Sequence, residues 1–155
     1  MNQMDRRGFL KLAGTGSAAA AAVATMPFIG SATVSDRGVL RFSASLGLPE
    51  RPLPSYATQI VEGTVDLTRG TGLVTSRVLA GHPEATSDIG LPGTARVIRV
   101  VAANADGARV RLRGLIEDRS QLRPGESPQV EIIIDKARGL VQAPFLGRPV
   151  ELRLA

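Results

Sequence analysis

The chain has 155 residues, with 19 lysines and arginines against 14 aspartates and glutamates, and a formal net charge of +5. It has no cysteine, which excludes a disulfide framework and a lipid-anchored lipoprotein. Tryptophan is absent and only 3% of the residues are aromatic, so binding of bases or sugars by stacking is poorly supported.

The N-terminal segment is a short polar head followed by a long uncharged run. No residue from 12 to 35 is charged, and the run is rich in alanine, glycine and threonine. A membrane-spanning helix needs about 20 predominantly apolar residues, so this composition makes a weak span. The head ends in a motif formed by Arg6, Arg7, Phe9, Leu10 and Lys11.

This segment resembles the twin-arginine export signal of bacteria and archaea, in which a polar residue and two arginines precede Phe-Leu-Lys. The resemblance implies export through the twin-arginine translocase to the periplasm or the cell exterior, in a folded state. Small residues suit cleavage after Ala32, or else after Ala24, and Pro27 would end the signal helix before the first of these sites. The alternatives are an ordinary secretory signal and a membrane anchor, and we expect membrane attachment only if the segment is retained.

Residues 33–155 are expected to form a single domain. They hold 16 basic and 13 acidic residues, so the high charge of the chain comes partly from the signal. This small excess, together with export, argues against nucleic acid as a partner. Among these basic residues only Lys136 is a lysine, and arginine favours planar partners such as carboxylates, although coding bias gives the same skew.

Apolar and polar residues alternate along most of this domain, which is the pattern of half-buried strands. Eight strands are predicted, at about 38–46, 57–67, 72–80, 94–103, 108–117, 129–135, 140–143 and 150–154. No amphipathic helix follows the signal helix. The pattern predicts an all-β domain of about eight antiparallel strands, either a small up-and-down barrel or a two-sheet sandwich.

The hairpin between the second and third strands has a predicted register. A two-residue loop near Arg69-Gly70 would place apolar pairs inside and an opposite-charge pair outside. The pairs would be Val61–Val78, Val65–Val74 and Glu62–Arg77.

The hairpin between the fourth and fifth strands is predicted to have a three-residue loop over 105–107, with Gly107 in the left-handed region. Its pairs would be Val100–Leu112, Ala102–Val110 and Arg99–Arg113. The like-charge pair needs compensation, because Arg109, Arg111 and Arg113 alternate on one face. The simpler source is the next strand, with Glu131 and Asp135, and the alternative is an anionic partner surface or a lipid headgroup.

Longer links alternate with the tight turns. In a simple meander the links at about 47–56, 81–93, 118–128 and 144–149 share one end, and they hold the nine prolines of residues 33–155. The segment from Arg123 to Glu126 is predicted to form a type II turn. Functional residues lie mostly on loops held by a rigid scaffold, so this end is predicted to bind.

The candidate binding residues at the loop end are Tyr56, His82, Glu84, Asp88, Arg119, Arg123 and Glu126. His82 with Glu84 and Asp88 would suit a metal or acid–base cluster, but a metal needs three or four ligands and neither a second histidine nor a cysteine is present. Arg119 and Arg123 would suit an anionic ligand. No metal, cofactor or catalytic residue is predicted, since nucleotide-binding and serine-hydrolase motifs are missing.

These features favour an exported binding or accessory protein whose partner is a protein or a small ligand. One alternative is a small barrel enzyme of the cyclase or isomerase type, which requires an internal cavity. The other is a subunit of an exported redox enzyme complex, which requires an exposed apolar face that includes Val101, Leu115 and Ile133.

Overall fold

The computed structural model describes residues 32–49 and 56–155, so the predicted export motif lies outside the described residues. The described part is all-β, as predicted, with one short 3-10 helix, η1 (Arg119–Gln121). Its strands are β1 (Thr33–Val34), β2 (Val39–Pro49), β3 (Tyr56–Asp66), β4 (Thr71–His82), β5 (Ala85–Gly90), β6 (Arg96–Asp106), β7 (Arg109–Ile116), β8 (Gln129–Asp135), β9 (Leu140–Phe145) and β10 (Arg148–Leu154).

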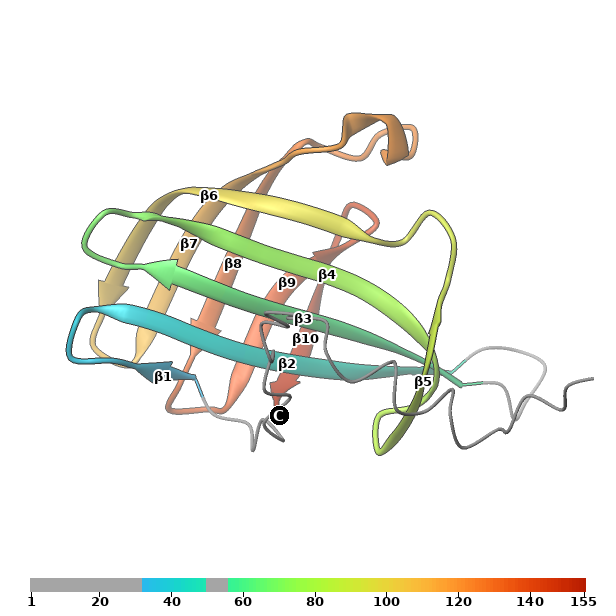
Figure 1. Cartoon of the computed structure of the whole chain (residues 1–155), viewed down its shortest axis with the longest axis horizontal. Helices are drawn as coiled ribbons and strands as arrows, with labels where there is room; N and C mark the ends of the chain where they lie inside the picture. The colour runs from blue at the N-terminus through green and yellow to red at the C-terminus, as the bar shows by residue number, and fades with distance from the viewer. Residues whose placement is uncertain (1–31, 50–55) are drawn as a thin grey trace, which may run out of the picture.

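Eight of these strands close into an up-and-down barrel (Figure 1). The order is β2, β3, β4, β6, β7, β8, β9 and β10, each antiparallel to the next, and β10 returns to pair with β2. These are the eight predicted strands, and their closed order makes the domain a barrel rather than a sandwich. Two strands that were not predicted pair with wall strands outside this closed order. Strand β1 pairs with β2, and β5 pairs with β4.

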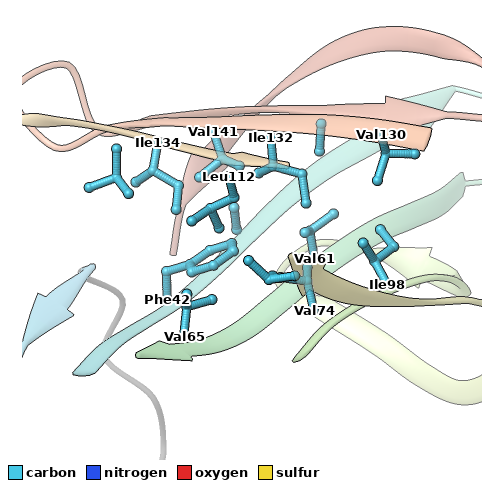
Figure 2. Close-up of a cluster of buried hydrophobic side chains, with 14 of the residues drawn as sticks. Phe42, Val61, Val65, Val74, Ile98, Leu112, Val130, Ile132, Ile134 and Val141 are labelled. Carbon is cyan, nitrogen blue, oxygen red and sulfur yellow. The ribbon is translucent and has the colours of Figure 1, made fainter. Parts of the chain in front are cut away.

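The interior of the barrel is filled by the inward-facing residues of every wall strand (Figure 2). Phe42 is the largest of these side chains and is buried among valines, leucines and isoleucines. It fits because Gly63 lies opposite it on β3, where an added Cβ would collide with the aromatic ring. The alternation of strand side chains thus supplies a close-packed core.

The predicted register of the β3–β4 hairpin is wrong by two residues. Asp66 pairs with Thr71 across a four-residue loop, so Val61 lies opposite Ser76. The cause is the Asp66 carboxylate, whose Oδ1 accepts 2.9 Å hydrogen bonds from the N–H groups of Thr68 and Arg69 and orders a wider turn. A shift of two residues keeps every side chain on its predicted face.

In that hairpin the charges predicted to pair still meet. Arg77 Nη2 lies 3.4 Å from Glu62 Oε2, although the two residues are diagonal neighbours rather than direct cross-strand partners. Diagonal positions remain within reach of long side chains.

The predicted β6–β7 register is also wrong. The loop has two residues, Gly107-Ala108, and Gly107 takes the predicted left-handed conformation at φ 55°. Strand β6 also contains a bulge between Val100 and Ala102. The bulge turns Ala102 from the predicted inner face to the outer face. The observed pairs that replace the predictions are Val100–Gly114, Ala102–Arg113, Ala103–Leu112 and Arg99–Leu115.

The links at 83–95 and 117–128 lie at one end of the barrel, as a meander requires, and most of the link predicted at 47–56 lies outside the described residues. The predicted long link at 144–149 is instead a tight turn, because β9 and β10 extend further than expected. Leu146 and Gly147 form that turn, with φ values of 49° and 86°.

The β9–β10 hairpin separates from both neighbours at this end. Pairing of β8 with β9 stops at Ile133–Gln142, and the next hydrogen-bonded position would set Glu131 opposite Pro144, which has no N–H. Pairing of β10 with β2 stops at Arg153–Ser45. If that register continued, Pro149 would lie opposite Pro49. Both the β8–β9 ladder and the β10–β2 ladder therefore have a proline at the position where they would continue.

Candidate functional site

The loop end of the barrel is held by a buried ion pair between Arg96 and Glu126. Arg96 Nε and Nη2 each donate a 2.9 Å hydrogen bond to one oxygen of the Glu126 carboxylate. The remaining guanidinium N–H groups donate to the carbonyl oxygens of Gly93, Ala95 and Gln121. The side chains are 6% and 5% exposed, so this arrangement ties the 117–128 link to the start of β6.

The type II turn predicted at the tip of this link is present. The Glu126 N–H donates to the Arg123 carbonyl oxygen at 2.9 Å, and Gly125 has a φ of 84°. The Glu126 carboxylate, a predicted ligand residue, also accepts a hydrogen bond from the Arg123 N–H. Its structural role was missed, although Arg96 at an inward strand position was a signal for a buried acidic partner.

The other predicted loop-end residues are spread over the surface. His82 ends β4, and its Nδ1 accepts a 3.3 Å hydrogen bond from the N–H of Glu84 in the following turn. Asp88 lies on β5, and in the described residues no group of three or more histidines and acids could hold a metal ion. Arg119 is exposed on η1. Tyr56 begins β3, and its side chain lies outside the described part of the chain.

Gln59 is an interior residue that sequence reasoning missed. It is fully buried on the inner face of β3, and its Nε2 donates to Ser76 Oγ at 3.2 Å and to the Pro144 carbonyl oxygen at 3.4 Å. Its Oε1 is buried without a hydrogen-bond partner among the described residues. The contact ties β3 to β9 across the barrel, and a glutamine at an inward position was the sequence signal for it.

The outer face of β6, β7 and β8 carries the alternating arginines. Arg109 Nη2 lies 3.3 Å from Asp135 Oδ2, and Arg111 Nε lies 3.4 Å from Glu131 Oε1. The neighbouring strand therefore compensates these two arginines, which was the simpler prediction. Two adjoining hollows of about 600 Å³ each open over these strands, and Arg113 lines both.

Three exposed aliphatic residues, Leu73, Val97 and Val101, form an outer patch on β4 and β6. Their exposed fractions are 46%, 39% and 52%, and all three point away from the core. Val101 was predicted to be exposed, whereas Leu115 and Ile133, predicted with it, are half-buried. Arg99 lies directly opposite Leu73 and between Val97 and Val101, so the outer patch is apolar around a charged centre.

The part of the chain that the structure describes has no helix long and apolar enough to span a bilayer. No family model, curated protein or solved structure matches the chain. The functional assignment therefore rests on the residues and contacts described above.

Proposed function

We propose that the protein is an exported binding or accessory protein that docks on a protein partner outside the cytoplasmic membrane. One contrast carries the proposal: the inner side of the barrel wall is packed and locked, whereas the outer side has exposed aliphatic residues and hollows. The resemblance of residues 1–32 to a twin-arginine signal supports export. The outer patch supports a protein partner, because such residues gain from burial against another apolar surface.

The barrel-enzyme alternative is not supported by the interior. A cyclase or isomerase of this size needs a cavity among its strands, and here Phe42, Leu112 and Ile132 fill that space (Figure 2). The hollows at Arg113 face outward, away from this core.

The outer patch also bears on the alternative of a subunit in an exported enzyme complex. Permanent subunits bury large and strongly apolar interfaces. The outer patch offers three exposed aliphatic side chains beside charged ones such as Arg99, and this composition suits a smaller interface. We therefore favour an accessory protein that associates reversibly over a permanent subunit.

The test is site-specific photo-crosslinking in cells that export the protein. A photoreactive residue at position 73 or 101 should crosslink to one discrete protein. The same residue at position 153, on β10 across the barrel from β6, should not. Val101→Glu should remove the crosslink formed from position 73 while leaving the melting temperature within about 2 °C, since a surface change alters stability little. Equal crosslinking from position 153, or none from 73 and 101, would rule out this docking face.

A further inference from the structure

The three outward arginines of β7 are unequally neutralised. Arg109 pairs with Asp135 and Arg111 with Glu131, but Arg113 has no ion-pair partner among the described residues. Arg113 lies opposite Glu131 on β8, yet the Glu131 Oε1 is the oxygen that approaches Arg111. One guanidinium therefore remains able to take a carboxylate from outside the chain.

The bulge in β6 keeps the space beside this guanidinium open. It places Ala102 opposite Arg113 on the outer face, so a methyl group stands where a longer side chain would cover the arginine. The extra residue, Val101, is turned outward and is 52% exposed. The resulting hollow of about 600 Å³ has Val101 and Leu115 among its apolar lining residues and Arg113 and Glu131 among its charged ones.

We propose that this hollow, the Arg113 cleft, binds a carboxylate side chain from an extended acidic and apolar segment of the partner protein. The inference rests on the proposed function. The guanidinium would receive the carboxylate, and a neighbouring aliphatic side chain would contact Val101 and Leu115. The Glu131 carboxylate lines the same hollow and repels a densely charged ligand, which favours one carboxylate over a phosphate or a layer of lipid headgroups.

The cleft is tested with the purified full chain and a fluorescein-labelled Asp-Leu-Asp-Leu-Asp-Leu peptide, followed by fluorescence anisotropy. Arg113→Gln should weaken binding by about tenfold, as expected for the loss of one charge-assisted hydrogen-bonded pair. Arg153→Gln removes the same charge from an outward position on β10 and should change Kd by less than about twofold, because charges beyond the Debye length are screened. A Lys-Leu-Lys-Leu-Lys-Leu peptide should not bind.

A second variant separates loss of the site from loss of the fold. Ala102→Glu places a carboxylate directly opposite Arg113, so it should abolish peptide binding while leaving the melting temperature unchanged or higher. Equal weakening by Arg113→Gln and Arg153→Gln would overturn the proposal, as would wild-type affinity in Ala102→Glu. Arg113-dependent binding to phosphatidylglycerol vesicles without peptide binding would overturn it in favour of headgroups. Crosslinks retained from positions 73 and 101 without peptide binding would reject the cleft and leave the docking face standing.

Discussion

Arg96 shows how a single inward-facing charge can be accommodated in a small barrel. Taking a guanidinium and a carboxylate out of water is expensive, and their attraction offsets that expense only when the remaining N–H groups are also bonded. Here Glu126 and three carbonyl oxygens receive hydrogen bonds from all the nitrogens of the Arg96 guanidinium. We call this ion pair the Arg96–Glu126 lock. Each side chain neutralises the charge of the other, and together they hold the 117–128 link against β6.

Glu126→Gln should destabilise the protein strongly. The substitution leaves the buried Arg96 charge without its counter-charge, and breaking a buried pair in this way costs about 3 kcal/mol or more. Urea unfolding of the variant and the wild type measures the difference. Glu62→Gln breaks the exposed Arg77 pair and should change the free energy of unfolding by less than about 1 kcal/mol. Similar losses in the two variants would contradict the lock.

The same pair predicts how stability responds to acid. The hydrogen bond from Arg96 lowers the pKa of Glu126 below its usual value of 4.5, and hydrogen bonds within their own turns lower the pKa of Asp118 and of Asp135. A lowered folded-state pKa contributes stability above the unfolded-state value, and the contribution is lost as the pH falls through the folded-state value. The melting temperature should therefore fall below about pH 4.5. Glu126→Gln should show a shallower fall, and a curve parallel to the wild type would contradict this assignment.

Gly63 is predicted to be intolerant of even one methyl group. Gly63→Ala would push a Cβ into the Phe42 ring and should cost about 1–3 kcal/mol, the usual range for overpacking a core. Gly90→Ala is the matched control, because nothing lies within 4 Å of the corresponding Cβ. Thermal unfolding compares the two, and equal stability would show that the Phe42 ring can move aside.

At the scale of elements, the β9–β10 hairpin is the least secured part of the wall. The Ile116 N–H donates to the Pro128 carbonyl oxygen and the Lys136 N–H to the Ala108 carbonyl oxygen, which fixes the even-numbered residues of β8 as those that bond β7. The Glu131 N–H therefore points toward β9, at the position where Pro144 ends the ladder. By the same alternation, the Glu151 N–H points toward β2 beyond the last β10–β2 pair.

Hydrogen exchange should reveal the two seams, which are the places where β9 loses its pairing with β8 and β10 loses its pairing with β2. The amides of Glu131 and Glu151 should exchange at least about tenfold faster than those of Ile132 and Leu152, which face paired strands, because unpaired amides need no opening reaction. Amide-resolved NMR exchange makes the comparison within one sample. Equal protection of neighbouring residues would mean that the seams are closed in solution.

The elements also show which local signals can be trusted. Glycine positions predicted the left-handed residues at Gly107 and Gly125 because only a residue without a side chain enters that region freely. The registers failed where a side chain rather than a glycine set the turn, as at Asp66, and where a bulge intervened, as at Val101. A bulge leaves no mark in the alternation until the partner strand is known.

At the scale of the whole molecule, barrel closure gives each of the eight wall strands a partner on both sides over at least part of its length (Figure 1). Open edges remain at the two seams, where prolines discourage pairing with other chains, and on the short strands β1 and β5. A compact, sealed domain of this kind suits a route that carries folded proteins.

Export itself is predicted to depend on the paired arginines. Replacing Arg6 and Arg7 together with lysine should leave the protein folded in the cytoplasm, because the resemblance to a twin-arginine signal implies that the translocase recognises the paired arginines. Cell fractionation measures its location, and protease resistance of the retained protein reports on folding. Lys11→Arg is the control and should export normally. Normal export of the double lysine variant would point to an ordinary secretory signal.

The candidate sites were only partly accessible to prediction. Compensation of Arg109 and Arg111 by β8 followed from alternation and strand order. The Arg113 cleft depends on the bulge that turns Ala102 outward. The loop-end candidates were chosen because loops carry function, but one of them, Glu126, is the buried partner of Arg96.

By itself the sequence determined the class of the fold, because a period of two with a Val, Leu and Ile face encodes strands regardless of what they pair with. It determined the neighbours across the tight turns, because short turns leave consecutive strands side by side, whereas the order across the longer links was an expectation that held only for a simple meander. Only the tertiary structure decided the closure by β10 and β2, the registers, the Arg96–Glu126 lock and the cleft at Arg113. Each of these depends on contacts between residues far apart in the chain, and local pattern carries no information about such distances.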